Sequence, residues 1–125
     1  MGDLVGSYAP SYEMILVAAR GRNSLKNGRN RDVMQVAPHR SNMLHPAQKP
    51  VELLEMLIKD STNEGDIVLD CFMGSGSTME ACLNTNRNGI GIELSEDYFN
   101  ISKKRLEEKR KEKDLQAGTL FGNEM

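Results

Sequence analysis

The stretch VLDCFMGSGSTMEACL, Val68 to Leu83, restricts the possible folds of this chain more than any other. It begins within IVLDCF, Ile67 to Phe72, a nearly unbroken apolar run typical of a strand covered on both faces in a parallel sheet. A glycine-serine corner follows, and then a helix-like pattern. A strand that ends in a glycine turn and enters a helix directs backbone N–H groups and a positive dipole end at a ligand. The stretch therefore predicts an α/β fold with a binding corner.

Helices and a second strand flank this stretch. Pro50 opens the helical pattern PVELLEMLIKD, since proline fits a first helical turn. GIGIEL, Gly89 to Leu94, resembles a second buried strand, and Ser95 is expected to cap a last helix. We expect Ser77 or Thr78 to cap the middle helix. The order helix, strand, helix, strand, helix predicts a parallel α/β unit.

The N-terminal part of the chain has weaker patterns. YEMILVAA, Tyr12 to Ala19, is apolar enough for a buried strand, and DVMQVAP, Asp32 to Pro38, fits a short edge strand. A basic loop lies between them, and its cations could contact phosphates or simply face solvent. These cations are Arg20, Arg22, Lys26, Arg29 and Arg31.

Composition narrows the classes of function. The chain has 125 residues and a formal net charge of −2, which suits one small domain and argues against a stand-alone nucleic-acid binder. No run approaches the ~18 apolar residues of a membrane helix, and no signal peptide is evident, so we expect a soluble cytoplasmic protein. Cys71 and Cys82 lie in apolar surroundings without a CxxC pattern, which predicts buried free thiols and no metal site.

The corner itself indicates which ligand it would hold. Gly74 and Gly76 lack a Cβ, so the backbone can approach a ligand closely. Glu93 ends the second strand, near the spacing at which an acidic side chain receives ribose hydroxyls. Asp70 would repel a pyrophosphate, but it suits a cationic ammonium group, such as that of S-adenosylmethionine. The alternative is a tight turn followed by a solvated glutamate.

Several segments resemble one known family, the circularly permuted DNA methyltransferases that modify adenine N6 or cytosine N4. DCFMGSGST, Asp70 to Thr78, is similar to the D-P-F-x-G-S-G-T-T cofactor loop of that family, with cysteine in place of proline. HPAQKP, His45 to Pro50, resembles the H-P-x-x-K-P segment that precedes this loop. GIGIEL, followed by Tyr98 and Arg105, resembles the second cofactor strand and its helix. The resemblance extends from about residue 11 to residue 106.

The resemblance implies a partial Rossmann-like methyltransferase fold, with a mainly parallel sheet and flanking helices, and S-adenosylmethionine as cofactor. In that fold Asp70 would hold the methionine amino end, Glu93 the ribose hydroxyls, and Leu94 would pack on the adenine. Lys49 could instead be an ordinary solvated lysine. The other residues implied for the cofactor site are His45, Gln48, Phe72, Gly74, Ser75, Gly76, Ser77 and Thr78.

The catalytic motif of the family does not occur in this sequence. That motif is Asp, Asn or Ser, then Pro-Pro and an aromatic residue, and it binds the exocyclic amine and stacks on the flipped base. The 125 residues contain no Pro-Pro, so no catalytic residue is assigned. We expect residues 1–44 to be the end of a catalytic half, 45–114 a cofactor-binding α/β unit, and 115–125 a loose tail.

The leading hypothesis is a site-specific DNA methyltransferase of the restriction-modification kind, represented by its cofactor-binding portion. The alternatives are a non-catalytic cofactor-binding or partner-binding remnant, a subunit of a split enzyme, and a nucleotide-binding piece of an oxidoreductase. Expected partners are DNA, through the complete enzyme, and either a missing catalytic half or a second copy, because a half-sheet leaves open edges. QAGTLF, Gln116 to Phe121, has a weak similarity to peptides that dock on replication sliding clamps.

Overall fold

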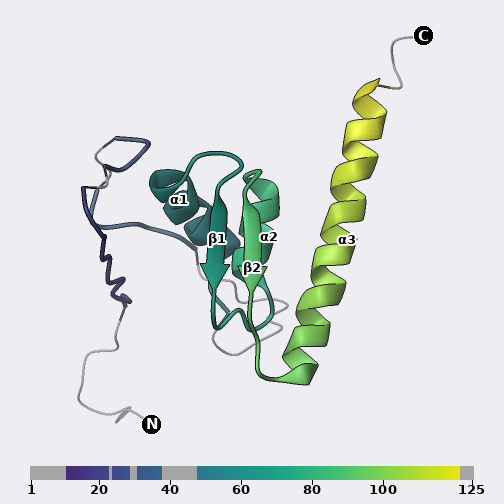
Figure 1. Cartoon of the computed structure of the whole chain (residues 1–125), viewed down its shortest axis with the longest axis horizontal. Helices are drawn as coiled ribbons and strands as arrows, with labels where there is room; N and C mark the ends of the chain where they lie inside the picture. The colour runs from purple at the N-terminus through teal and green to yellow at the C-terminus, as the bar shows by residue number, and fades with distance from the viewer. Residues whose placement is uncertain (1–10, 23, 29–30, 38–47, 122–125) are drawn as a thin grey trace.

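The computed structural model describes residues 11–22, 24–28, 31–37 and 48–121 (Figure 1). Three helices and two strands alternate along the chain in the predicted order. They are α1 (Val51–Ser61), β1 (Ile67–Asp70), α2 (Ser77–Asn84), β2 (Asn88–Gly91) and α3 (Glu96–Phe121). The predicted α/β class is therefore confirmed.

β1 and β2 pair in parallel, in a register that runs from Ile67 opposite Asn88 to Asp70 opposite Gly91. The pairing continues past the strands, because the Ile92 N–H donates to the Asp70 carbonyl at 2.9 Å. α2 is the crossover between the two strands. The carboxyl ends of both strands therefore lie together, next to the glycine corner that precedes α2.

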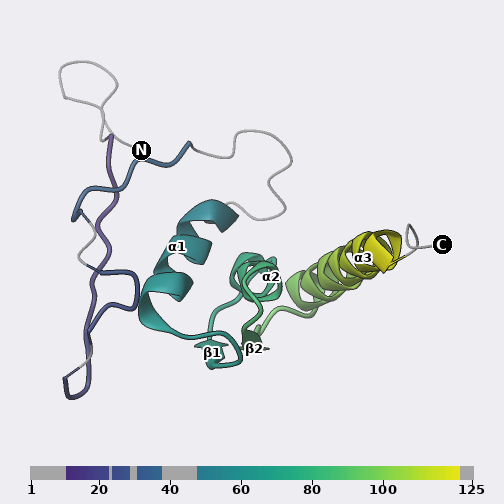
Figure 2. The same cartoon turned by 90° about the horizontal axis from the view of Figure 1, so that it is seen from above.

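The three helices lie on one side of the sheet, with α2 between α1 and α3 (Figure 2). The opposite face is uncovered in the part of the chain that the structure describes: Ile67, Leu69 and Ile90 are 65%, 58% and 53% exposed. The expectation of strands covered on both faces is therefore wrong for these residues. A continuous apolar run shows that both faces of a strand are apolar, but it does not show whether other elements cover those faces.

Sulfur-containing side chains fill the space between α2 and the sheet. Met79 and Cys82 of α2 are buried with Met73 of the corner. Gly89 on β2 makes this packing possible, because a Cβ there would lie 2.7 Å from the Met79 sulfur. Cys71 is exposed, and both cysteines are free, so the prediction of two buried thiols holds only for Cys82.

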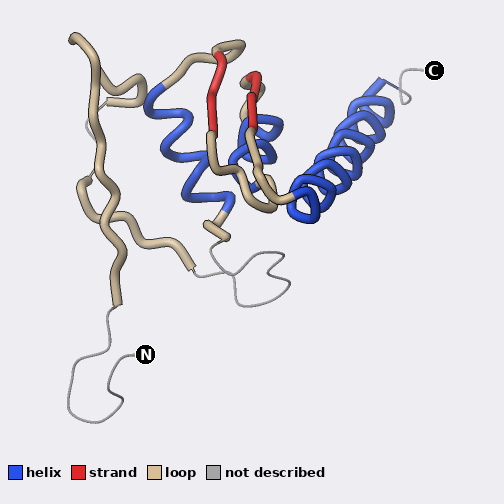
Figure 3. Tube along the Cα trace, turned by 60° about the horizontal axis from the view of Figure 1, so that its bottom comes forward, coloured by secondary structure: helices blue, strands red, loops and turns tan. Residues whose placement is uncertain are grey.

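The described residues of the N-terminal segments form no strand. Residues 11–19 and 31–37 run as extended, mostly exposed chain beside α1 (Figure 3). They are attached through Lys26, whose N–H donates to the Asp60 carbonyl at 2.8 Å, and through Asn27, whose amide donates to the Asp60 carboxylate. The two strands predicted in this region are wrong for the described residues, since no neighbouring strand lies there to pair with them.

The helix ends differ in part from the sequence predictions. Ser95 caps α3 as expected, because its Oγ accepts a hydrogen bond from the Tyr98 N–H at 3.4 Å. α2 begins at Ser77 itself and its cap is Gly76, so neither Ser77 nor Thr78 is the cap. α3 continues as a helix to Phe121, past residue 115, where we expected a tail. None of the described helices combines the length and apolarity that crossing a membrane requires.

Candidate functional site

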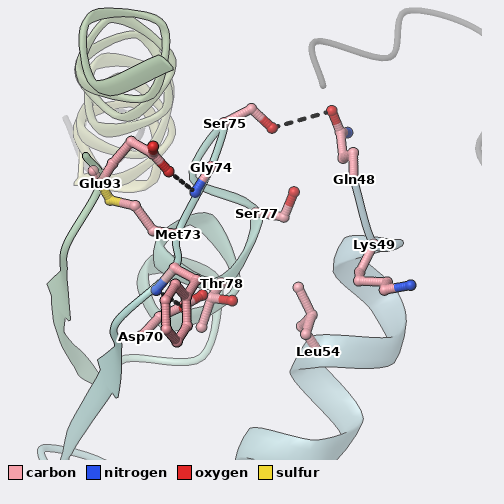
Figure 4. Close-up of a pocket in the computed structure, with 11 residues that line it drawn as sticks. Gln48, Lys49, Leu54, Asp70, Met73, Gly74, Ser75, Ser77, Thr78 and Glu93 are labelled. Carbon is pink, nitrogen blue, oxygen red and sulfur yellow. Dashed lines mark hydrogen bonds between the residues drawn. The ribbon is translucent and has the colours of Figure 1, made fainter. Parts of the chain in front are cut away.

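A cavity of about 330 Å³ lies at the carboxyl ends of the strands, between the glycine corner and α1 (Figure 4). Its size falls in the range of small-molecule sites, roughly 300–1,000 Å³. The N-terminal end of α2 faces this cavity, so the positive end of the helix dipole is part of its wall. The residues that line it are Gln48, Lys49, Leu54, Asp70, Phe72, Met73, Gly74, Ser75, Ser77, Thr78 and Glu93.

Two left-handed glycines give the corner its shape. Gly74 has φ 54° and Gly76 has φ 87°. L-residues with a Cβ adopt these angles at a cost, which explains glycine at both positions. The Gly76 N–H donates to the Met73 carbonyl at 2.9 Å, which closes the turn before α2 begins. The corner is therefore a preformed loop.

Glu93 holds this loop from the end of the second strand. Its Oε2 accepts the Gly74 N–H at 2.8 Å and its Oε1 accepts the Ser95 N–H at 2.8 Å. The same carboxylate also lines the cavity. Sequence reasoning predicted Glu93 as a ribose contact but missed its support of the loop. The only sequence signal was its place after a strand that neighbours the corner.

Asp70 lies at the end of β1, with one carboxylate oxygen committed to the turn. That oxygen accepts the Phe72 N–H at 2.9 Å, which fixes the side chain at the cavity wall. Lys49 lines the cavity from the segment before α1 and forms an exposed ion pair with Glu13. Such pairs contribute only ~0–1 kcal/mol. The cavity therefore carries acidic groups on the strand side and a lysine on the α1 side.

Gln48 connects the segment before α1 to the loop, because the Ser75 hydroxyl donates to its Oε1 at 3.3 Å. This contact spans 27 residues of sequence, and the resemblance alone predicted that Gln48 belongs to the site. His45 lies outside the described residues. Arg29 does too, whereas the other basic residues of the loop, Arg20, Arg22, Lys26 and Arg31, are exposed and do not line the cavity.

Leu94, which the resemblance places against the adenine, has a fully exposed side chain and does not line the cavity. It lies beyond β2, where nothing among the described residues covers it. Leu54 and Met73 line the cavity but were not predicted. Leu54 could have been found, since it lies on the apolar face of α1, in the first turn of that helix.

Cys82 lies behind the corner and is not a reactive group. Burial raises the pKa of its thiol above the usual value, and the negative charge of Asp70 acts in the same direction. Arg87 opposes this shift as the smaller influence. The thiol therefore stays protonated at neutral pH, consistent with a role in packing.

Parallel strands, a glycine loop at their carboxyl ends and an acidic residue at or just beyond the end of each strand define a Rossmann-like ligand-binding unit. The particular family follows from a comparison with known proteins. A family model described as DNA methylase matches residues 5–104. The chain belongs to this family, the N6/N4 DNA methyltransferases.

Individual relatives agree with this assignment. Over 63 residues the chain is 51% identical to the type II methyltransferase M.HpaI of Haemophilus parainfluenzae. The aligned stretch covers 50% of this chain and 20% of M.HpaI. Among solved structures it is similar to an M1.HpyAVI–SAM complex, with 42% identity, a TM-score of 0.56, and coverage of 67% of this chain and 43% of that one.

A second solved structure is the PvuII DNA methyltransferase, named as cytosine-N4-specific. It has 27% identity and a TM-score of 0.54, over 59% of this chain and 30% of that one. The chain thus spans about a fifth of the length of M.HpaI and less than half of either solved structure.

Proposed function

We propose that this chain supplies the S-adenosylmethionine-binding part of a DNA amino-methyltransferase that acts on adenine N6 or cytosine N4. The observation that carries the proposal is the cavity at the glycine corner, with Asp70 and Glu93 on its strand side. The family and the similarity to a chain solved as a SAM complex support it.

The chemistry of the lining residues fits this cofactor. S-adenosylmethionine carries an ammonium group, a sulfonium, a carboxylate and two ribose hydroxyls. Asp70 and Glu93 offer acceptors to the cationic groups and the hydroxyls. Lys49, Ser77 and the N-terminal end of α2 offer donors and positive potential to the carboxylate. Each polar group of the cofactor thus has a matching group in the cavity wall.

When bound, the cofactor supplies an electrophilic methyl group, and the residues of this chain bind and orient it. Methyl transfer then depends mainly on positioning and electrostatics. The groups that hold the target base belong to the Pro-Pro motif, which the 125 residues lack. This absence favours a second candidate function for the chain in isolation: a cofactor-binding or partner-binding module without methylation activity.

Titration of the purified chain with S-adenosylmethionine in a calorimeter tests the main proposal. We expect micromolar binding, which Asp70→Ala weakens about tenfold, the loss typical of one charged hydrogen bond. Asp97→Ala is the matched control, because Asp97 is exposed in the first turn of α3 and does not line the cavity. A folded chain that does not bind the cofactor contradicts the proposal.

DNA would be contacted through the exposed basic residues of the N-terminal segment, Arg20, Arg22, Lys26 and Arg31. They are proposed to meet phosphates in the complete enzyme, which would work in the cytoplasm. Such contacts fix position on the duplex and carry no sequence information.

The uncovered face of the sheet supports a further proposal, that the chain associates with a second copy or with the catalytic half. Ile67, Leu69 and Ile90 expose apolar area next to strand edges that no described residue pairs with, and such surfaces invite association. Light scattering of the chain alone at high concentration is expected to show a dimer or a larger species. A monomer throughout the concentration range contradicts self-association.

A further inference from the structure

Arg105 of α3 contacts the glycine loop but does not line the cavity. Its side chain is only 14% exposed. Its Nη1 donates to the Ser77 hydroxyl at 3.2 Å and to the Ser75 carbonyl at 3.3 Å. Its Nε donates to the Glu80 carboxylate at 2.5 Å. One guanidinium therefore connects both serines of the loop to the first turn of α2.

The close approach of α3 to the loop depends on Gly76. A Cβ at this position would lie 2.9 Å from the Cβ of Ser102, which is buried one helical turn before Arg105. Because the loop has no side chain there, α3 packs directly on its backbone. This packing holds the Arg105 side chain beside Ser75 and Ser77.

The direction of these hydrogen bonds follows from the chemistry of the groups. A guanidinium can only donate, so Ser77 Oγ must accept from Arg105, and its own hydrogen is left for an acceptor in the cavity. Ser75 Oγ lies 3.4 Å from the same Nη1 and donates to Gln48. Glu80 balances the positive charge that Arg105 brings to the N-terminal end of α2. Arg105 therefore determines that the serine hydroxyl of Ser77 is presented to the cavity as a donor.

We propose that Arg105 is a positioning residue for the amino-acid end of the cofactor, acting through Ser75 and Ser77. Ser75, Ser77 and Gln48 gather on the side of the cavity that faces Lys49, away from Glu93 (Figure 4). A hydroxyl donor and a lysine on one side suit a carboxylate, whereas Glu93 serves the ribose on the other side. This inference rests on the proposed function, since it assigns an orientation to the same ligand.

Calorimetry with two ligands tests the role of Arg105. S-adenosylmethionine has the amino-acid end, whereas 5′-methylthioadenosine has the adenosine and the sulfur without it. Arg105→Gln is expected to weaken binding of S-adenosylmethionine about tenfold and to change binding of 5′-methylthioadenosine less than about twofold. Arg110→Gln is the matched control, because Arg110 is an exposed arginine of the same helix. It is expected to leave both affinities unchanged.

A double-mutant cycle with Ser77→Ala tests whether Arg105 acts through the serine. In the Ser77→Ala background, Arg105→Gln should cost little further affinity, because coupled residues are non-additive. Additive losses, or equal losses for both ligands, overturn the proposal and make Arg105 a general stabiliser. If Arg105→Gln unfolds by circular dichroism, Arg105→Lys replaces it and the same selective loss is expected. A lysine cannot reproduce the fork that reaches Glu80 and both serines at once.

The same experiment distinguishes failure of the proposed function from failure of the role proposed for Arg105. If the unaltered, folded chain binds neither ligand, the cavity is not a cofactor site, and the role of Arg105 is refuted with it. If the unaltered chain binds both ligands with equal affinity, the function stands, and the carboxylate side assigned to Ser75 and Ser77 is wrong.

Discussion

Glu93→Gln is expected to weaken binding of S-adenosylmethionine about 100-fold, the equivalent of ~2.7 kcal/mol. The carboxylate accepts the N–H groups of Gly74 and Ser95, one on each oxygen. An amide of the same shape keeps one acceptor and turns an N–H₂ donor toward the other N–H, so one bond becomes a repulsive contact. The substitution therefore loosens the loop and also removes an acceptor proposed for the ribose. Charged hydrogen bonds contribute ~1.5–3 kcal/mol each, which supports the size of this effect.

Calorimetry gives the affinity, and the amide NMR shifts of Gly74 and Ser95 report whether the loop has moved. Glu96→Gln is the matched control, because Glu96 is exposed in the first turn of α3. Binding within threefold of the unaltered chain, with both amide shifts unchanged, would show that Glu93 is only a solvated strand end.

Gly76→Ala is expected to lower the free energy of unfolding by ~2–5 kcal/mol. The left-handed φ of 87° costs an L-residue ~1–2 kcal/mol, and overpacking costs ~1–3 kcal/mol more. The overpacking arises because the new Cβ would lie 2.9 Å from the Ser102 Cβ and 3.4 Å from its Cα, so α3 must move away from the loop. Urea denaturation followed by circular dichroism measures the change.

Gly65→Ala separates the two contributions. Gly65 has nearly the same φ, 85°, but nothing lies within 4 Å of the Cβ that would be added there. Its substitution should cost only the backbone term, ~1–2 kcal/mol. Equal losses at both positions would show that α3 accommodates the methyl group and that its packing on the loop is loose.

The sequence predicts the local parts of this fold well. The strand, the glycine corner and the following helix are contiguous, so each is determined by near neighbours, and the structure confirms their order. The two N-terminal strands fail for the opposite reason. A strand exists only with a partner, and the apolar run of residues 12–19 indicates β propensity without saying whether a partner is present. The exposed face of the sheet could not be predicted for the same reason, because the sequence does not show whether another element covers it.

The same distinction between local and long-range contacts applies to the candidate site. Gly74, Ser77 and Asp70 belong to one short motif, so their joint place at the cavity could be predicted. The contacts that fix the loop could not be predicted, because Arg105 is 30 residues from Ser75 in sequence and Glu93 is 19 residues from Gly74. Neither spacing predicts a hydrogen bond to the loop, and only the packing of α3 and β2 around the loop brings these groups together.

The lining of the cavity has one further consequence. All of its residues fall between Gln48 and Glu93, in a single continuous stretch of the chain. One uninterrupted segment of gene therefore encodes all the lining residues that belong to the described part of the chain. Rearrangements that cut and rejoin a gene outside this segment would keep these lining residues together, whereas a break between Asp70 and Glu93 would separate one of the two acidic residues from the loop. Domain shuffling in such a family should accordingly spare this segment and vary what surrounds it.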